Sequence, residues 1–426
     1  MGRKILFSYK HTLCACYLGD IIQAAVVNLT PILFIPLREQ FGLSYQQLGT
    51  LIFANFITQV ICDFAFGPLV DRYGFRPFIT AAQAVAALGF TLFALSPLLL
   101  EDPYPGFLAA TVIFSGSGGL QELLLSPIVN TLPIEGDANA KAKAMTILHS
   151  FYAWGQVAVV LLTTLFIYWL GAESWPWILM GWTALPLVNL FLFSRVPLGT
   201  PVPEGSQRTG VRTLFTSRFF VVSLTAVVMG AAAEVCMSQW TSAFMERAMG
   251  LPKVMGDTIG VCLFAAMLGL GRLLHGIFGD RMDLDRVMLL GFSLCFVCYL
   301  VVGLSGIPLL SLLACALCGL GASLLWPGTL VLADRRFPAA GAMMFAILAG
   351  AGDIGCSVAP WLMGIVTEQA PRLPALAGLT WLSAEELGLR AGMFFAALFP
   401  LAGFFCLQWM RRQSRPAARA EQPKGV

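Results

Sequence analysis

Charged residues and histidines are scarce in this sequence. Of its 426 residues only 12% are charged, whereas 58% are hydrophobic. So little charge excludes an ordinary soluble domain, and a net charge of +3 gives no basis for nucleic-acid binding. The three histidines, His11, His149 and His275, are too far apart in sequence to form a zinc motif.

Catalytic and nucleotide-binding motifs are also absent from the sequence. It contains no G-x-x-x-x-G-K-[ST], H-E-x-x-H or G-x-S-x-G pattern. Two C-x-x-C pairs, Cys295/Cys298 and Cys315/Cys318, lie in apolar segments without a flanking histidine, and we interpret them as packing residues. The absence of these motifs argues against an ATP-driven pump and against an enzyme. It also leads us to expect no cofactor and no metal site.

Long apolar segments dominate what is present. About 20 apolar residues cross a bilayer as a helix, and twelve stretches satisfy this length. The sequence therefore predicts an all-α membrane protein with twelve transmembrane helices embedded in the lipid bilayer. The expected spans are 12–37, 45–70, 77–100, 105–132, 144–170, 176–194, 219–245, 255–279, 287–305, 308–332, 341–368 and 390–410.

The distribution of Lys and Arg predicts the orientation of these spans. With both termini on one side, 21 of the 26 basic residues fall on that side and 5 on the other. Basic residues are enriched in cytoplasmic loops, so both termini are expected in the cytoplasm of a protein of the cell (inner) membrane. We expect an uncleaved first span, because no small-residue cleavage site follows it.

The stretch Phe114–Pro127, FSGSGGLQELLLSP, carries one carboxylate, Glu122, in a predicted span. A charge at the centre of a span costs about 2.5–3.5 kcal/mol on insertion scales, and such residues face a protein interior or a water-filled path. Gly116, Gly118 and Gly119 would let a neighbouring helix approach closely. Glu122 is therefore a candidate functional residue. A structural carboxylate that interacts with a neighbouring helix is the alternative.

Polar residues also follow one side of the first span. Asp20 and Gln23 lie at helical spacing, with Tyr17 and Asn28 close to the same face. A polar stripe on an apolar span is expected to face inward. Asp20 could also be an interfacial residue, because it lies toward the cytoplasmic half.

A charged loop signal occurs twice. GPLVDRYGFRP, at 67–77, is echoed by GRLLHGIFGDRMDLDR, at 271–286, and Asp71 and Asp280 are 209 residues apart. This spacing indicates duplication of a six-span unit. We predict an N-terminal bundle over 1–195, a cytoplasmic linker over 196–217, a C-terminal bundle over 218–412 and a disordered tail over 413–426.

The first loop resembles the signature loop of the major facilitator superfamily, in the pattern Gly67-x-x-x-Asp71-Arg72-x-Gly74-x-Arg76. The second copy retains Asp280 and Arg281 after Gly276 and Gly279. The resemblance implies two six-helix bundles around a central cavity, as in the major facilitator fold, and transport by alternating access. It assigns gating roles to these loop residues: Gly67, Asp71, Arg72, Gly74, Arg76, Asp280 and Arg281.

Spans four and five resemble the fucose/galactose/glucose–proton symporter branch of that superfamily. The branch carries a Glu shortly before a Pro in span four, as Glu122 precedes Pro127, and an Asp in span one, matched by Asp20. The resemblance implies that these acids are proton and sugar sites. Tyr17, His149 and Tyr152 depart from the fucose permease of this branch, so the identity of the sugar does not carry over.

Other residues complete the expected site. Glu234 is the second-half counterpart of Asp20, and Asp353 is flanked by glycines in its span, so both join the proton-coupling candidates. Arg272 and His275 are explained by snorkelling and ion pairing near the cytoplasmic end. His149 is either a neutral structural histidine or a ligand. The expected substrate-binding residues are Tyr17, Gln23, Asn28, His149, Tyr152, Gln156, Trp240 and Trp326.

These observations favour a monomeric secondary transporter for proton-coupled uptake of a sugar or related polar metabolite. A sodium ion could replace the proton, because the same carboxylates coordinate either. A proton-antiport exporter of drugs or metabolites is the alternative within transport. A polytopic membrane enzyme is the alternative from another class, and it lacks a catalytic constellation in this sequence.

Overall fold

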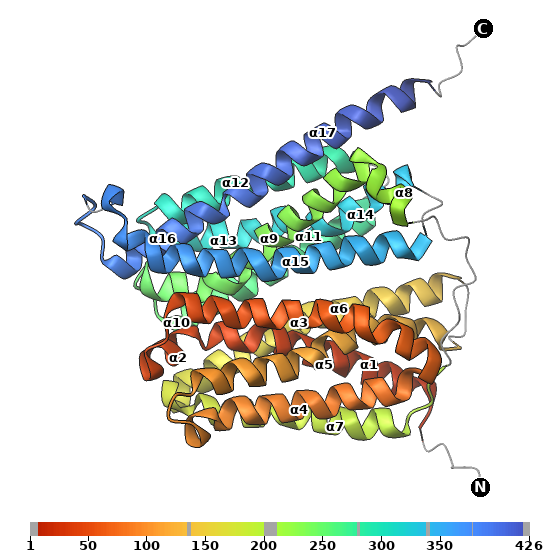
Figure 1. The fold of residues 1–426 in the computed structure, drawn as a ribbon, viewed down its shortest axis with the longest axis horizontal. Helices are drawn as coiled ribbons and strands as arrows, with labels where there is room; N and C mark the ends of the chain where they lie inside the picture. Colours follow the sequence, from red (N-terminus) through yellow and green to blue (C-terminus); the bar gives the residue numbers. More distant parts are fainter. Residues whose placement is uncertain are drawn as a thin grey trace. The chain divides into compact units, whose positions relative to one another are not determined.

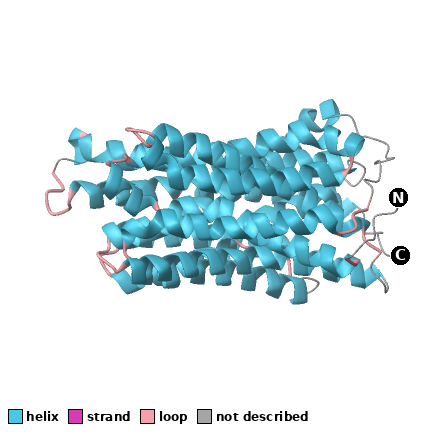
Figure 2. Cartoon of the chain, turned by 90° about the horizontal axis from the view of Figure 1, so that it is seen from below, coloured by secondary structure: helices cyan, strands magenta, loops and turns pink. Residues whose placement is uncertain are grey.

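The computed structural model describes residues 7–133, 138–199, 211–278, 282–337, 341–376 and 378–420. All regular secondary structure in these ranges is helical, and no strand occurs there (Figure 2). Among the described residues, twelve helical stretches are long and apolar enough to cross a membrane, which confirms the predicted all-α membrane protein with twelve spans.

The chain divides into two compact units, Met1–Glu204 and Gly205–Val426. In the first unit, the long helices run side by side (Figure 1). Its helices are α1 (Tyr9–Ile32), α2 (Phe34–Phe41), α3 (Tyr45–Tyr73), α4 (Phe75–Leu99), α5 (Tyr104–Thr131), α6 (Ala138–Leu170) and α7 (Trp175–Arg195).

The second unit contains the other six spans, several of which are built from more than one helical segment. Its α-helices are α8 (Val211–Thr216), α9 (Arg218–Arg247), α10 (Lys253–Met255), α11 (Leu263–Phe278), α12 (Leu284–Leu304), α13 (Pro308–Ala322), α14 (Leu325–Arg336), α15 (Gly341–Gln369), α16 (Ala384–Ala396) and α17 (Leu398–Ala420). The helix α8 lies within the predicted linker, and α17 continues past the predicted start of the tail at residue 413.

Corresponding spans pack against each other in the same way in both units. Helix α1 packs on α6 as α9 packs on α15, and α3 packs on α5 as α11 packs on α13. The third and sixth spans also meet in each unit, as α4 with α7 and α12 with α17. The sequence duplication therefore corresponds to a repeated six-helix architecture.

Local backbone changes interrupt several spans. The first span divides between α1 and α2 at Leu33, two residues after Pro31, and the tenth divides between α13 and α14 at Ser323 and Leu324. A π-helical segment, Gly256–Cys262, joins α10 to α11. Such irregularities in a span require other polar partners for the freed backbone groups.

Small residues set the spacing between α3 and α5. A Cβ atom added to Gly119 would lie 2.8 Å from the backbone oxygen of Gln59, and one added to Gly118 would lie 2.9 Å from its side-chain Oε1. These two glycines therefore permit the close approach predicted from the sequence. A Cβ added to Gly116 would meet only Cys62 Sγ, at 3.8 Å. The resulting contact brings the polar side chains of α3 beside those of α5.

Candidate functional site

Three carboxylates from three spans gather in the N-terminal unit. Asp20 lies on α1, Asp63 on α3 and Glu122 on α5. Carboxylate oxygens of Asp63 and Glu122 lie within 4.8 Å of one another, and Glu122 is close enough to Asp20 for an electrostatic interaction. Asp20 is buried, Asp63 is half-buried and Glu122 is exposed. The arrangement combines an accessible carboxylate with two more sheltered ones.

These carboxylates have few polar partners in the described part of the chain. Asp20 Oδ2 and Asp63 Oδ1 are buried atoms without a hydrogen-bond partner there. Among the described side chains, the ion pairs of Lys and Arg include none of the three carboxylates. A site of this kind is suited to accept protons or a cation, because those would supply the missing positive charge.

A chain of amide side chains lies beside the carboxylates. Gln23 Nε2 donates to Gln59 Oε1 at 2.8 Å, Gln59 Nε2 donates to Asn55 Oδ1 at 2.5 Å, and Asn55 Nδ2 donates to the backbone oxygen of Val26 at 2.7 Å. This chain links α1 to α3. Gln23 Oε1 remains a buried acceptor without a partner among the described residues.

A second amide cluster joins α4 to α5. Gln83 Nε2 donates to Gln121 Oε1 at 3.2 Å, and Gln121 Nε2 donates to Ser117 Oγ at 3.0 Å. Gln121 directly precedes Glu122, so this cluster lies next to the exposed carboxylate along α5. Buried amide networks of this kind make an arrangement specific when their members are paired.

The predicted substrate residues of the N-terminal unit have different environments. The Tyr17 ring stacks on Phe151 with centroids 4.5 Å apart and planes 3° apart, which joins α1 to α6. Asn28 is buried and donates to the backbone oxygen of Ala24 on its own helix at 2.9 Å. Gln156 is buried and Tyr152 half-buried on α6. The side chain of His149 lies outside the described part of the structure.

In the C-terminal unit, the central charged contact joins Glu234 of α9 to Arg272 of α11. Arg272 Nη2 lies 3.6 Å from Glu234 Oε2, and Arg272 Nε donates to the backbone oxygen of Ser323 at 3.2 Å. The expected ion pairing of Arg272 is therefore observed. Its partner, however, lies near the middle of a span.

Three other predicted residues of this unit are packed into helix contacts. Trp240 is fully buried in α9, and Asp353 is buried in α15. Trp326 packs against a buried apolar cluster that includes Val227 and Leu348, and a Cβ added to Gly352 would lie 2.6 Å from its ring. Gly352 therefore accommodates the Trp326 indole.

The predicted gating loop is described in part. Gly74 has a φ of +82° and lies between α3 and α4, which explains why glycine occupies this turn. Arg76 donates to the backbone oxygens of Phe193 and Val196, both at 2.7 Å, and so satisfies carbonyl groups at the end of α7. Arg72 is exposed, with its guanidinium 5.2 Å from the Tyr73 ring centroid.

The other gating candidates are Gly67, Asp71, Asp280 and Arg281. A Cβ added to Gly67 would have no heavy atom within 4 Å, so no close helix contact requires glycine there. The side chain of Asp71, and the whole of Asp280 and Arg281, lie outside the described residues.

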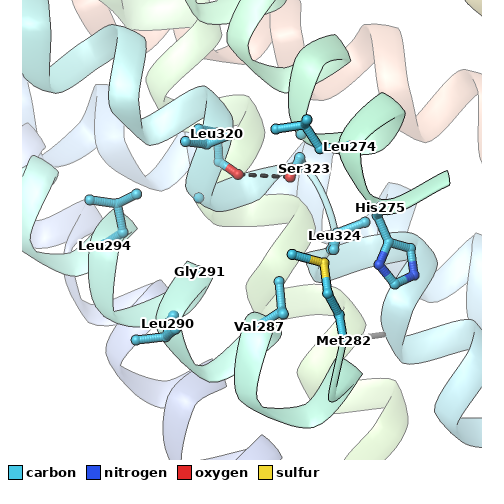
Figure 3. Close-up of a pocket in the computed structure, with 12 residues that line it drawn as sticks. Leu274, His275, Met282, Val287, Leu290, Gly291, Leu294, Leu320, Ser323 and Leu324 are labelled. Atoms are coloured by element: carbon cyan, nitrogen blue, oxygen red, sulfur yellow. Dashed lines mark hydrogen bonds between the residues drawn. The ribbon is translucent and has the colours of Figure 1, made fainter. Parts of the chain in front are cut away.

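A cavity of about 240 Å³ lies in the C-terminal unit, walled by α11, α12 and the junction of α13 and α14. Leucine side chains surround most of it in Figure 3, where Ser323 donates to the backbone oxygen of Leu320 and His275 lies at one edge. Its leucine walls offer few partners to a polar ligand. The carboxylates and the Glu234–Arg272 pair are therefore the better candidates for polar chemistry.

Sequence reasoning missed Asp63. The segment ICDFAF carries it in the middle of an apolar stretch, and this is the same signal that identified Glu122. Sequence reasoning also missed Asn55, Gln59, Gln83 and Gln121. Uncharged amides give only a weak signal within apolar spans, so their connection through α3, α4 and α5 emerges only from the structure.

The repeated twelve-span architecture is that of one large class of membrane transporters. The family model described as Major Facilitator Superfamily matches residues 16–360 and 257–426. The chain therefore belongs to the Major Facilitator Superfamily, whose members are transporters and not enzymes.

Solved structures of transporters share this fold. A D-xylose–proton symporter is similar with a TM-score of 0.74 at 14% identity, over 94% of this chain and 97% of the other. A bacterial homologue of the human lysosomal transporter Spinster has a TM-score of 0.75 at 15% identity, over 97% and 98%. The nucleoside transporter NupG has a TM-score of 0.71 at 13% identity, over 94% and 98%. At these identities the likeness concerns the fold alone.

A curated relative matches part of the chain. It is described as a probable 4-methylmuconolactone transporter of Cupriavidus pinatubonensis (strain JMP 134 / LMG 1197), and is 25% identical over 215 residues. The match covers 49% of this chain and 47% of the relative, so the chain spans about half the length of that protein.

Proposed function

We propose that this protein is a secondary active transporter that couples proton entry to uptake of a sugar or related polar metabolite. The observation that carries the proposal is the proximity of Asp63 and Glu122, with Asp20 alongside. Like charges in a poorly solvated site repel each other, and the described residues supply no Lys or Arg partner. Binding of a proton relieves that repulsion, and a sodium ion would act in the same way.

The exposed position of Glu122 gives it the first role in coupling. It exchanges protons with water, while Asp20 and Asp63 hold a proton in the more sheltered part of the site. Inward movement of one positive charge gains about 2.3 kcal/mol for each 100 mV of membrane potential. Glu234 and Asp353 are further proton-coupling candidates in the C-terminal unit.

The resemblance to the fucose/galactose/glucose–proton symporter branch supports a polar substrate, as do the names of several similar proteins. These names describe a D-xylose–proton symporter, a nucleoside transporter and a probable 4-methylmuconolactone transporter. We assign the substrate contacts to Tyr17, Gln23, Asn28, His149, Tyr152, Gln156, Trp240 and Trp326.

Alternating access in this proposal is controlled by the two charged loops. Asp71, Arg72 and Arg76 in the first loop, with Asp280 and Arg281 in the second, hold the cytoplasmic side closed in outward-facing states. Both termini lie in the cytoplasm, as the distribution of basic residues indicates.

Uptake into proteoliposomes tests the proposed function. The purified chain is reconstituted with an alkaline interior, and hexoses, deoxyhexoses, polyols, sugar acids and 4-methylmuconolactone are supplied outside. We expect one group of compounds to accumulate, and accumulation to stop when a protonophore removes the gradient. Accumulation that requires sodium would reassign the coupling ion. Accumulation of drugs or metabolites only under the opposite pH gradient would favour the exporter.

A further inference from the structure

Arg272 has an incompletely occupied guanidinium group. Its contacts in the described residues are the 3.6 Å approach to Glu234 and one hydrogen bond of 3.2 Å to the backbone oxygen of Ser323. An Arg–carboxylate pair with two aligned hydrogen bonds has N···O distances of about 2.7–2.9 Å. Arg272 therefore retains donors that could bind a second planar anion.

Arg390, in the same unit, has a structural role and provides a comparison for Arg272. Its Nε and Nη2 atoms both lie 2.9 Å from Glu386 Oε1, and Nη1 donates to the backbone oxygens of Gly303 and Ser305. Its side chain is 11% exposed, whereas the Arg272 side chain is 45% exposed. The guanidinium donors of Arg390 are therefore occupied by acceptors of the protein, whereas those of Arg272 are only partly occupied.

The location of Arg272 also argues against a purely interfacial role. Its guanidinium turns toward Glu234, near the middle of α9, and toward the carbonyl at the break between α13 and α14. An arginine within a span faces protein or a water-filled path, because lipid does not solvate it. The Arg272 side chain is 45% exposed at this position within a span. We interpret this exposure as access to water, and hence to a dissolved solute.

We infer that Arg272 binds a carboxylate group of the transported substrate, and that Glu234 occupies this position when the substrate is absent. This inference rests on the proposed transport function and narrows its substrate class to small organic acids. The Glu234 contact is long, and its side chain is 19% exposed, so an incoming carboxylate can replace it. Arginine suits this role because its planar fork matches both oxygens of a carboxylate.

The exchange involves no covalent chemistry. The guanidinium releases one carboxylate and accepts another, while its hydrogen bond to Ser323 keeps the side chain oriented. Neutral analogues of the same shape lack the charge and cannot displace Glu234. Discrimination between an acid and its neutral analogue is therefore the direct signature of the site.

Binding of matched compounds to the purified full chain tests the inference. The probes are galacturonate against galactose, and 4-methylmuconolactone against its methyl ester, followed by calorimetry in detergent. We expect at least one acid to bind about tenfold or more tightly than its neutral counterpart, as loss of a charge-assisted contact predicts. We expect Arg272→Gln to abolish that difference while leaving the neutral compound unaffected.

Two further variants separate ligand binding from structural effects. Arg272→Lys retains the charge, and we expect intermediate discrimination from a protein with the parent melting temperature. Glu234→Gln removes the internal competitor, so we expect tighter binding of the acid. Arg286→Gln is the matched control, because Arg286 is 70% exposed and pairs with Asp283, and we expect no change in acid binding.

Several results would overturn the inference. These are equal binding of acids and neutral analogues, binding of neither acid, discrimination retained in Arg272→Gln, or weaker acid binding in Glu234→Gln. Proton-driven accumulation of galactose without acid binding would reject the role of Arg272 and leave the proposed transport function standing. Acid binding at Arg272 without accumulation in proteoliposomes would instead reject the transport function.

Discussion

Carboxylate oxygens of Asp63 and Glu122 lie within 4.8 Å of each other, although the residues belong to different spans. Gly118 and Gly119 make this proximity possible by letting α5 approach α3. Two carboxylates at this separation respond to each other's charge. A change at either residue should therefore alter ion coupling.

Asp63→Asn tests the contribution of the residue that sequence reasoning missed. We expect proton-driven accumulation to fall about tenfold, within the range of about 5–150-fold that typical coupling free energies produce. Glu101→Gln, an exposed change in the segment between α4 and α5, is the control and should accumulate substrate as the parent does. Parent-level accumulation by Asp63→Asn would remove Asp63 from the coupling site.

Gly119→Ala tests the contact between α3 and α5. The added methyl would overlap the backbone of Gln59, which cannot rotate away, so we expect destabilisation of about 1–3 kcal/mol. Gly116→Ala places its methyl at an ordinary distance from Cys62 and should cost less than about 0.5 kcal/mol. Melting temperatures in detergent provide the comparison, and equal values for the two variants would contradict the packing described.

Arg76→Lys tests whether Arg76 stabilises the fold. Lysine cannot donate to Phe193 and Val196 in the same forked geometry, so we expect a loss of about 1.5–3 kcal/mol, measured as a lower melting temperature. Arg72→Lys, at an exposed position in the same loop, should melt close to the parent. If Arg72→Lys proved the more destabilising change, this assignment would be wrong.

Asp71→Asn tests the gating hypothesis. Loss of the loop charge should favour inward-open forms without changing the substrate site. Ligand affinity in detergent and the accessibility of cysteines introduced at each end of the spans are the measurements. Unchanged cysteine accessibility at both ends would count against a latch in this loop.

Most of the fold was predictable from the sequence, because apolar length determines which segments can span a bilayer. All twelve spans were predicted, and the repeat was visible in the loops that contain Asp71 and Asp280. The break between α13 and α14 and the π-helical segment at Gly256–Cys262 were not predicted. Hydropathy does not report backbone geometry within an apolar segment.

The candidate site was predictable only in part. An isolated acid in an apolar span is a strong local signal, which identified Asp20, Glu122 and Glu234. The pairing of Glu234 with Arg272 depends on how α9 packs beside α11, and no spacing along the chain reveals it. The burial of Trp240 and the stacking of Tyr17 on Phe151 likewise arise from tertiary packing.

Counterflow and accumulation by Glu122→Gln test the central claim most directly. The glutamine mimics the neutral acid permanently, so the variant should exchange labelled substrate across proteoliposomes at a rate close to the parent. It should fail to concentrate that substrate under a pH gradient, because no proton can be released. Glu173→Gln, an exposed change between α6 and α7, should behave as the parent in both assays. Accumulation by Glu122→Gln at the parent level would contradict proton coupling through this carboxylate.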